Sequence, residues 1–380
     1  MLLRHPMGFR KASTRSLRTV ALLALASLLL VGSLAPSAGG ADRTAAVHHP
    51  IQRHKPKQRP LYWGAWIGSQ LTGTPAPWDM NAVTQFQNMV GKGLSLVEFS
   101  SPFADCGRSP CAFTRFPAAE MEAIRASGAI PFYSWGSQST PAADANQPDF
   151  QLADVNAGTY DSYIRSVAEE ARAWGHPFFL RFDWEPNGNW FVWDEGVNGN
   201  LPGEFVSAWR RVHDIFGAVG AANVTWVWCP YADAAYRFGP LARFFPGRSY
   251  VDWTCLDGYN WSNAPVNPHP WASFDKIFYP SYQTIVKRLA PEKPMILGEM
   301  ASNGIGRGKA TWIRDMFTAL RTKYQRVRGI IWFDQYSQGI TWPIETSAAT
   351  VNAFSRGIRG GPYRPNIYAG LAESPIAPPR

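Results

Sequence analysis

The ten residues RFDWEPNGNW, at positions 181–190, combine side chains that seldom occur together. They include a guanidinium, two carboxylates, two amides and two indoles, a mixture that suits neither a solvated loop nor an apolar core. A further carboxylate, Glu299, ends the apolar run PMILGE at 294–299. Two facing carboxyl groups can cut a glycosidic bond, because one protonates the departing oxygen while the other attacks the anomeric carbon or activates water. Glu185 and Glu299 are the candidates for this pair.

The elements that would position these residues are short strands alternating with helices. Eight apolar, β-rich runs lie at 61–67, 94–100, 130–135, 177–184, 224–229, 251–259, 294–299 and 329–334. Stretches with helical spacing lie between most of them, and three such stretches end in glycine, at 79–93, 160–175 and 202–220. Short buried strands that alternate with helices predict parallel strands and crossover connections.

Eight such units in about 300 residues predict an α/β fold, a single (β/α)8 TIM barrel. The alternative is an open doubly wound sheet, but no glycine-rich phosphate loop follows the first strand. Catalytic groups of a barrel lie where strands end. Glu185 follows the fourth strand and Glu299 ends the seventh, so we expect them to face each other across the barrel mouth. A single glutamate after a strand is more often a solvated loop residue, but the aromatic and amide neighbours favour a site.

Alternation along the fourth strand makes a further prediction. Arg181, Asp183 and Glu185 are two residues apart and should point to the same side. We therefore expect Arg181 to pair with Asp183 inside the barrel, either as a structural ion pair or to keep a carboxylate ionised.

All 17 tryptophans follow residue 60, and many lie at strand ends. An indole offers a flat apolar surface to the C–H face of a sugar ring. Packing in the core is the ordinary role for any one tryptophan. Trp190, Trp193 and Trp332 are the exceptions that we expect to contact sugar, because they sit beside the carboxylates at the strand ends.

The segment LRFDWEPNGNWFVW resembles the acid/base segment of glycoside hydrolase family 26, and KPMILGEMAS resembles the nucleophile strand of that family. The resemblance runs in strand order over 61–359. It implies a retaining enzyme of the (β/α)8 class in which Glu185 is the acid/base and Glu299 is the nucleophile. It implies no metal and no organic cofactor. Most members of the family are β-mannanases, and some act on mixed-linkage β-glucan or β-xylan.

The same resemblance suggests the substrate-binding residues. Tyr259, in LDGYN, resembles the tyrosine that contacts the nucleophile, and Trp332 resembles the tryptophan under the subsite where the bond is cut. Trp190 resembles another aromatic residue that contacts sugar, and Asn187 belongs to the same motif. Trp184 departs from the pattern, because the family usually has histidine there. We count Trp184 among the substrate-binding residues, and the departure leaves the polysaccharide open.

Both ends of the chain lie outside the predicted barrel. Residues 1–41 combine a basic start, the apolar run 20–34 and small residues, as in a secretory signal peptide. Cleavage is expected near Ala38 or Ala41, and a retained membrane anchor is the alternative. The basic residues 42–60 predict a disordered linker, either a plain spacer or a segment that associates weakly with the cell wall. Residues 360–380 are expected to be a loose Pro/Gly-rich tail.

The net charge of +9 comes from the first 60 residues, because 27 basic and 27 acidic residues follow from position 61. The composition therefore does not favour nucleic acid binding, and we expect a monomer whose partner is a polysaccharide.

An even cysteine count in an exported chain favours disulfides. We expect Cys106–Cys111, which bracket a short loop, and Cys229–Cys255, on successive strands. A zinc site is the weaker alternative because the spacings do not fit.

These observations favour a secreted glycosidase that acts on a β-linked polysaccharide, with mannan first. The alternative from another class is a non-catalytic carbohydrate-binding protein on a hydrolase scaffold, with Trp184 a mark of decay. The presence of both glutamates argues against that alternative.

Overall fold

The computed structural model describes residues 59–380, except 108, 142–144, 233–238, 305–307 and 338. The predicted signal peptide and nearly all of the predicted linker lie outside the described residues. Among the helices of the described ranges, none has the length and apolar character needed to cross a bilayer.

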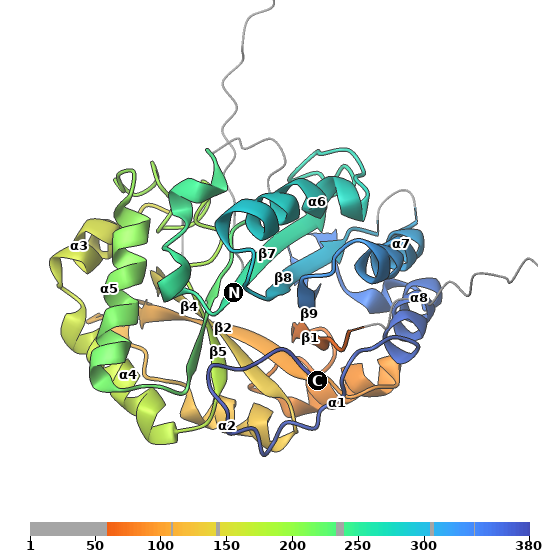
Figure 1. The fold of residues 1–380 in the computed structure, drawn as a ribbon, viewed down its shortest axis with the longest axis horizontal. Coiled ribbons are helices and arrows are strands. Elements are labelled where there is room, and N and C mark those ends of the chain that lie inside the picture. The colour runs from red at the N-terminus through yellow and green to blue at the C-terminus, as the bar shows by residue number, and fades with distance from the viewer. Residues whose placement is uncertain (1–58, 108, 142–144, 233–238, 305–307, 338) are drawn as a thin grey trace, which may run out of the picture. The chain divides into compact units, whose positions relative to one another are not determined.

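Eight parallel strands form a closed barrel (Figure 1). They are β1 (Tyr62–Ile67), β2 (Leu96–Asp105), β4 (Ile130–Thr140), β5 (Phe178–Phe182), β6 (Val224–Trp228), β7 (Trp253–Asn260), β8 (Met295–Ser302) and β9 (Val327–Asp334). Each strand pairs with the next in this order, and β1 pairs with both β2 and β9, which closes the ring. The predicted (β/α)8 barrel is confirmed, and the open doubly wound sheet is excluded.

Two short hairpins extend from the barrel. β3 (Ala112–Phe113) pairs antiparallel with the end of β2, and β10 (Tyr336–Ser337) pairs antiparallel with β11 (Ile340–Thr341) after β9.

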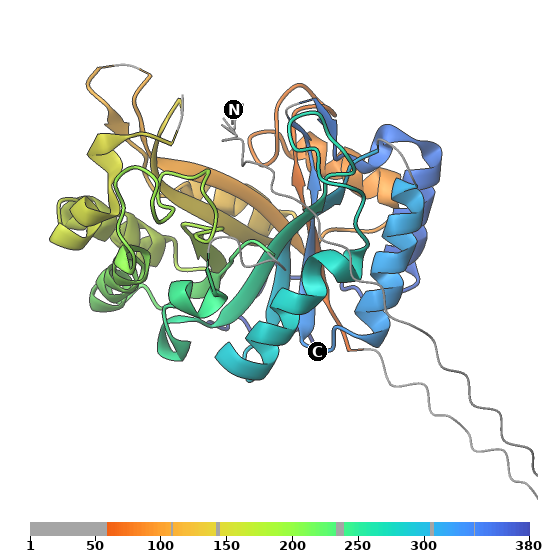
Figure 2. The same cartoon turned by 90° about the horizontal axis from the view of Figure 1, so that it is seen from above.

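Helices cover the outside of the strands, as Figures 1 and 2 show. They are α1 (Met80–Val90), α2 (Ala118–Ala126), α3 (Leu152–Ala157), α4 (Asp161–Trp174), α5 (Glu204–Val219), α6 (Phe274–Thr284), α7 (Lys309–Thr322) and α8 (Ala348–Arg359). The three predicted helices correspond to α1, α4 and α5. Their ends follow the expected rules, since Asp79 caps α1 and Gly91, at φ 77°, ends it in the left-handed conformation.

The interior of the barrel is built in layers. Near the amino ends of the strands the layer is aromatic, with ring centroids 5.5 Å apart for Phe179 and Trp253 and 6.1 Å apart for Tyr62 and Trp253. Above it, Arg181 and Glu98 are completely buried. The aromatic layer therefore lies between these two polar side chains and the amino ends of the strands.

The carboxyl-terminal residues 360–380 are packed, so the expectation of a loose tail was wrong. The tail crosses the amino ends of the strands, where the Trp253 indole donates to the Ile376 carbonyl over 2.7 Å. The Ile376 amide donates to Thr225 Oγ1 over 2.8 Å, and the Ile376 side chain is 2% exposed. Tyr62 Oη donates to the Ala377 carbonyl over 2.8 Å. Composition alone does not show that the barrel floor supplies these partners.

Both predicted disulfides are present, Cys106–Cys111 and Cys229–Cys255. The second is buried and joins the end of β6 to β7. β6 and β7 are neighbours in the barrel, which is the condition on which this pairing was predicted.

The two disulfides should differ in their contribution to stability. They join residues 26 and 5 positions apart, so loss of chain entropy in the unfolded state gives about 3.5 kcal/mol for Cys229–Cys255 and about 2 kcal/mol for Cys106–Cys111. We expect Cys229→Ala/Cys255→Ala to lower the free energy of unfolding more than Cys106→Ala/Cys111→Ala. Guanidinium unfolding under non-reducing conditions measures both. Equal losses of unfolding free energy in the two double variants would contradict this dependence on loop length.

Candidate active site

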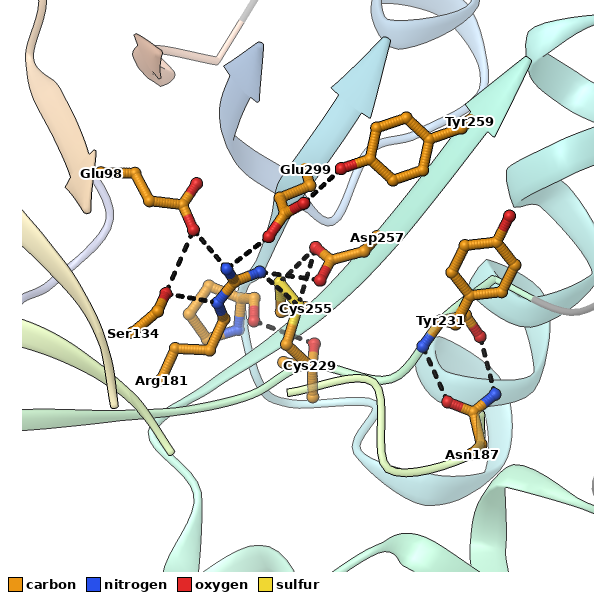
Figure 3. The surroundings of a disulfide bond; sticks show 12 residues. Glu98, Ser134, Arg181, Asn187, Cys229, Tyr231, Cys255, Asp257, Tyr259 and Glu299 are labelled. Carbon is orange, nitrogen blue, oxygen red and sulfur yellow. Dashed lines mark hydrogen bonds and ion pairs between the residues drawn. A yellow bond between two sulfur atoms is a disulfide. The ribbon is translucent and has the colours of Figure 1, made fainter. Parts of the chain in front are cut away.

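Arg181 lies at the centre of the barrel and binds side chains from four other strands (Figure 3). Its Nε donates to Ser134 Oγ over 2.7 Å, and its Nη1 donates to Asp257 Oδ2 over 2.7 Å. Its Nη2 donates to Glu299 Oε1 over 2.5 Å and also to Glu98 Oε1. One guanidinium therefore ties β5 to β2, β4, β7 and β8 beneath the barrel mouth.

Three carboxyl groups share this single positive charge. Burial raises the pKa of Glu98 well above its usual value, although Arg181 opposes the shift. Burial likewise raises the pKa of Asp257, again against the effect of Arg181. Burial alone would lower the pKa of Arg181, but the surrounding carboxylates raise it above its ordinary value. The cluster thus keeps Arg181 charged and favours a proton on one of its carboxyl groups.

Glu299 is held at both oxygens. Arg181 donates to Oε1, and Tyr259 Oη donates to Oε2, which is the predicted contact of Tyr259. Burial raises the pKa of Tyr259 well above its usual value, and the Glu299 charge adds to the shift, so the phenol keeps the proton that it donates. The two donors therefore fix the position of the Glu299 carboxyl group.

Gly298 leaves the room that this arrangement needs. A Cβ at this position would lie 2.4 Å from Cys255 Sγ and 2.8 Å from Asp257 Oδ1. Strand β8 can therefore approach the disulfide and Asp257 only with glycine beside Glu299.

Glu185 lies beyond the end of β5. Its amide donates to the Cys229 carbonyl over 2.7 Å, and its φ of 54° lies in the left-handed region. Trp190 Nε1 donates to Glu185 Oε2 over 2.7 Å. Burial raises the pKa of Glu185 well above its usual value, the Glu299 charge raises it further, and the Trp190 hydrogen bond opposes both.

The two predicted glutamates meet at the barrel mouth. One carboxylate oxygen from each of Glu185, Asp257 and Glu299 lies within 4.8 Å of the others. Glu185 and Glu299 are 114 positions apart in the chain, so the fold alone brings them together. A buried carboxylic acid beside a carboxylate with two donors can act as a proton donor next to a nucleophile.

Three carboxylates so close together could in principle hold a cation. Arg181 already donates to both Asp257 and Glu299, and a metal bound there would face its buried positive charge. These carboxylates therefore suit the guanidinium of Arg181, which already lies among them, better than a metal ion.

The predicted ion pair between Arg181 and Asp183 is wrong. Asp183 instead accepts hydrogen bonds from the Ser137 amide over 2.7 Å and from Ser137 Oγ over 2.8 Å. Burial raises the pKa of Asp183 to about 8, while the Ser137 hydrogen bonds oppose the shift. β5 ends at Phe182, and Asp183 has a φ of 41°, so strand alternation stops before this residue.

The expectation that Trp332 lies under a sugar subsite is also wrong. Trp332 is completely buried and faces the outer helices, with ring centroids 6.1 Å from Trp312 of α7 and 5.4 Å from Phe354 of α8. Its neighbour Phe333 faces inward, 5.8 Å from Tyr259. Successive strand residues point to opposite faces of the sheet. Trp332 therefore faces the helices, and Phe333, one position further along, faces the interior.

Trp184 and Trp193 lie in a packed aromatic cluster rather than on an open surface. Their ring centroids are 4.9 Å apart, and Trp193 Nε1 donates to the Trp184 carbonyl over 2.7 Å. The Trp184 ring also lies 5.1 Å from the guanidinium carbon of Arg181. Both tryptophans are buried, so they support Arg181 and the loop that carries Glu185.

Asn187 and Trp190 have different places. The side chain of Asn187 makes two hydrogen bonds with the backbone of Tyr231. Its Nδ2 donates to the Tyr231 carbonyl over 2.9 Å, and its Oδ1 accepts from the Tyr231 amide over 2.7 Å. Asn187 therefore fixes the loop after β5 to the loop after β6. Trp190 is only partly buried, and its ring lies 5.3 Å from that of Tyr231.

Sequence reasoning missed Glu98 and Ser134 as partners of Arg181. Glu98 is the only charged residue in the apolar run 94–100, which could have marked it as an inward-facing ionic residue. Ser134 gives no comparable indication.

Comparison with known proteins supports the same class of fold and site. The model of glycosyl hydrolase family 26 matches residues 131–304, a range that includes both Glu185 and Glu299. Endoglucanase H of Acetivibrio thermocellus is 30% identical over 325 residues, which cover 82% of this chain and 32% of that protein. The chain thus spans about a third of the length of this relative.

Solved structures share the barrel at low sequence identity. A modular endo-β-1,4-mannanase from Cellulomonas fimi is 18% identical with a TM-score of 0.62, and 84% of this chain and 75% of that chain are covered. The catalytic domain of an endo-β-1,4-mannanase from Bacillus sp. JAMB-750 is 15% identical with a TM-score of 0.61, over 83% and 91% of the two chains. The likeness to these solved structures concerns the fold, while residues 131–304, which carry both glutamates, match the model of glycosyl hydrolase family 26.

Proposed function

We propose that this protein hydrolyses a β-linked polysaccharide with retention of anomeric configuration. The observation that carries the proposal is the approach of Glu185 and Glu299, whose nearest oxygens lie within 4.8 Å at the barrel mouth. Retaining glycosidases place their two carboxyl groups about 5–5.5 Å apart, whereas inverting enzymes leave room for a water molecule.

Glu299 is the nucleophile in this mechanism and Glu185 is the general acid. Ionised Glu299 attacks the anomeric carbon, while Glu185 gives its proton to the leaving glycosidic oxygen, so the C–O bond breaks and a glycosyl ester forms. Glu185, now a carboxylate, then removes a proton from water as the water attacks the same carbon. This second step releases the sugar and restores both side chains.

The buried cluster gives the two glutamates different surroundings. Arg181 and Tyr259 both donate to Glu299 and hold its two oxygens in place. Glu185 has no cationic hydrogen-bond partner among the contacts of the described residues, and burial raises its pKa. Environments that separate two carboxyl groups in this way define an acid and a nucleophile.

Mannan is the first candidate substrate, with internal cleavage as in a mannan endo-1,4-β-mannosidase. It is supported by the family resemblance and by the mannanases among the proteins of similar fold. β-Glucan is the second candidate, favoured by the name of the endoglucanase relative. The matched third of that relative need not be the part that its name describes.

We further propose that the protein is secreted and that residues 42–60 are a linker, either a plain spacer or a segment that associates weakly with the cell wall. The amino-terminal sequence pattern supports export, and the two disulfides are compatible with an oxidising compartment. Both disulfides lie in the described part of the chain, whereas the leader does not.

Removing either carboxyl group should abolish hydrolysis. We expect Glu185→Gln and Glu299→Gln each to lower kcat/KM on a soluble β-glycan at least about a hundredfold, because a positioned acid or base contributes about 10²–10⁴. Circular dichroism should show that both variants are folded. Glu169→Gln, on the exposed side of α4, is the matched control and should keep full activity. A residual rate above about a hundredth would refute the role of that glutamate.

Substrates with an activated aryl leaving group separate the two roles. Glu185→Gln should form the glycosyl ester without acid assistance and accumulate it, and added azide should release a glycosyl azide of retained configuration. Glu299→Gln should give neither result. A glycosyl azide of inverted configuration from Glu185→Gln would contradict the double displacement.

Trp190→Phe should change the pH dependence of the reaction. The Trp190 donor favours the Glu185 carboxylate, so its loss raises the pKa of Glu185 and leaves the acid protonated to higher pH. The alkaline limb of kcat/KM should therefore move to higher pH. Trp174→Phe on α4 is the control and should not move it. A limb that stays in place or moves to lower pH would show that Glu185 is not the acid.

Substrate preference can be measured directly. If mannan is the substrate, kcat/KM on galactomannan should exceed that on mixed-linkage β-glucan and on xylan at least about tenfold. The reason is that loss of matched polar contacts costs about 1–3 kcal/mol. The reverse order for mixed-linkage β-glucan would select the second candidate. Absence of reducing ends from all three, with intact oligosaccharide bound, would instead indicate a carbohydrate-binding protein.

A further inference from the structure

Lys309 is the first residue of α7, and its side chain is buried at 4% exposure. A helix start carries partial positive charge and disfavours a cation, so the helix itself gives no reason for lysine there. The ammonium instead donates to three consecutive backbone carbonyls, those of Thr341, Trp342 and Pro343, over 2.8, 2.7 and 2.5 Å. The residue type at this position is explained by these carbonyls.

The segment 341–343 separates the outer layer of the barrel from the site. On the outer side, the Trp342 carbonyl also accepts from Trp332 Nε1 over 3.2 Å, and Lys309 Nζ lies 5.8 Å from the Trp332 ring. On the inner side, the Trp342 ring lies 5.0 Å from Tyr259 and 5.2 Å from Trp261. Tyr259 in turn donates to Glu299.

The contacts of Lys309 fit its charged form. An ammonium has three protons to donate, one for each carbonyl, whereas a neutral amine has two. The charged groups that act on it are Asp334, at the end of β9, and Glu345, and Thr346 Oγ1 lies 3.5 Å from Nζ. Burial lowers the pKa of Lys309 to about 7, and the two carboxylates oppose the shift. A neutral amine could not donate to all three carbonyls at once.

We propose that Lys309 is a positioning residue of the active site, which fixes backbone 341–343 and so holds Trp342 against Tyr259 and, through it, Glu299. The inference rests on the proposed function, because its catalytic consequence requires Glu299 as nucleophile. Lys309 touches neither the reacting glutamates nor the sugar, so its influence passes through packed groups alone.

The test compares variants at two lysines of one helix. Lys309→Met keeps the length of the side chain but cannot donate, and Lys309→Ala leaves space for an added amine. Lys323→Met, at the other end of α7, removes only an exposed ion pair with Asp275 and is the matched control. For each protein, kcat and KM are measured on a soluble β-glycan, and hydrogen exchange is measured for the amides of residues 340–346.

We expect Lys309→Met to lower kcat at least tenfold with KM changed less than threefold, because a loosened Tyr259 affects the reacting carboxylate rather than sugar binding. The Ile344 amide, which donates to Asp334 Oδ1, should exchange at least tenfold faster. Added n-propylammonium, which matches the atoms that alanine lacks, should restore kcat of Lys309→Ala severalfold, and n-propanol should not. Lys323→Met should stay within twofold of the wild type throughout.

Several results would overturn the inference. A folded Lys309→Met variant with wild-type kcat would do so. Equal rescue of Lys309→Ala by n-propanol would also do so, because it would indicate that Lys309 only fills space. A fall in kcat without faster exchange in 340–346 would exclude the route through this segment. Failure of the proposed function looks different, because the wild type itself would then release no reducing ends.

Discussion

A single buried guanidinium organises the interior of this barrel. Arg181 contacts residues of four other strands, and three of these contacts are with carboxyl groups that would repel one another without it. Removing one partner of such a cluster leaves uncompensated buried charge, which costs several kcal/mol. The aromatic layer below, the indole of Trp184 beside the guanidinium and the disulfide next to Asp257 all serve to enclose this charge. The proposed acid and nucleophile lie directly above it.

Support for the site comes in successive shells around Glu299. Tyr259 and Arg181 contact the carboxylate, Trp342 and Phe333 pack against Tyr259, and the outer layer secures the segment that carries Trp342. Precise placement of a reacting group requires such packing behind its immediate neighbours. Among the buried tryptophans, Trp184 and Trp342 pack against Arg181 and Tyr259 of the site. Trp312 and Trp332 instead pack between the barrel and the outer helices.

Much of this structure follows from local sequence patterns. Eight apolar runs, the glycine stops of three helices and the position of Glu185 and Glu299 after their strands suffice to predict the barrel and the meeting of the two glutamates. Two of the errors share one physical origin. The pairing of Arg181 with Asp183 and the role of Trp332 both assumed regular alternation of side chains along a strand. The alternation stops at Asp183, where the backbone is left-handed. At Trp332, an error of one residue in the alternation puts the side chain on the opposite face of the sheet. Glu98 was missed because its partner is 83 positions away.

The backbone at the end of β5 has a consequence for how this protein could change. Asp183 and Glu185 both adopt positive φ, a conformation that costs residues other than glycine about 1–3 kcal/mol each. Glycine or asparagine would relieve that cost, yet either would sacrifice a carboxyl group. Selection for heat resistance alone would therefore erode this corner of the barrel first.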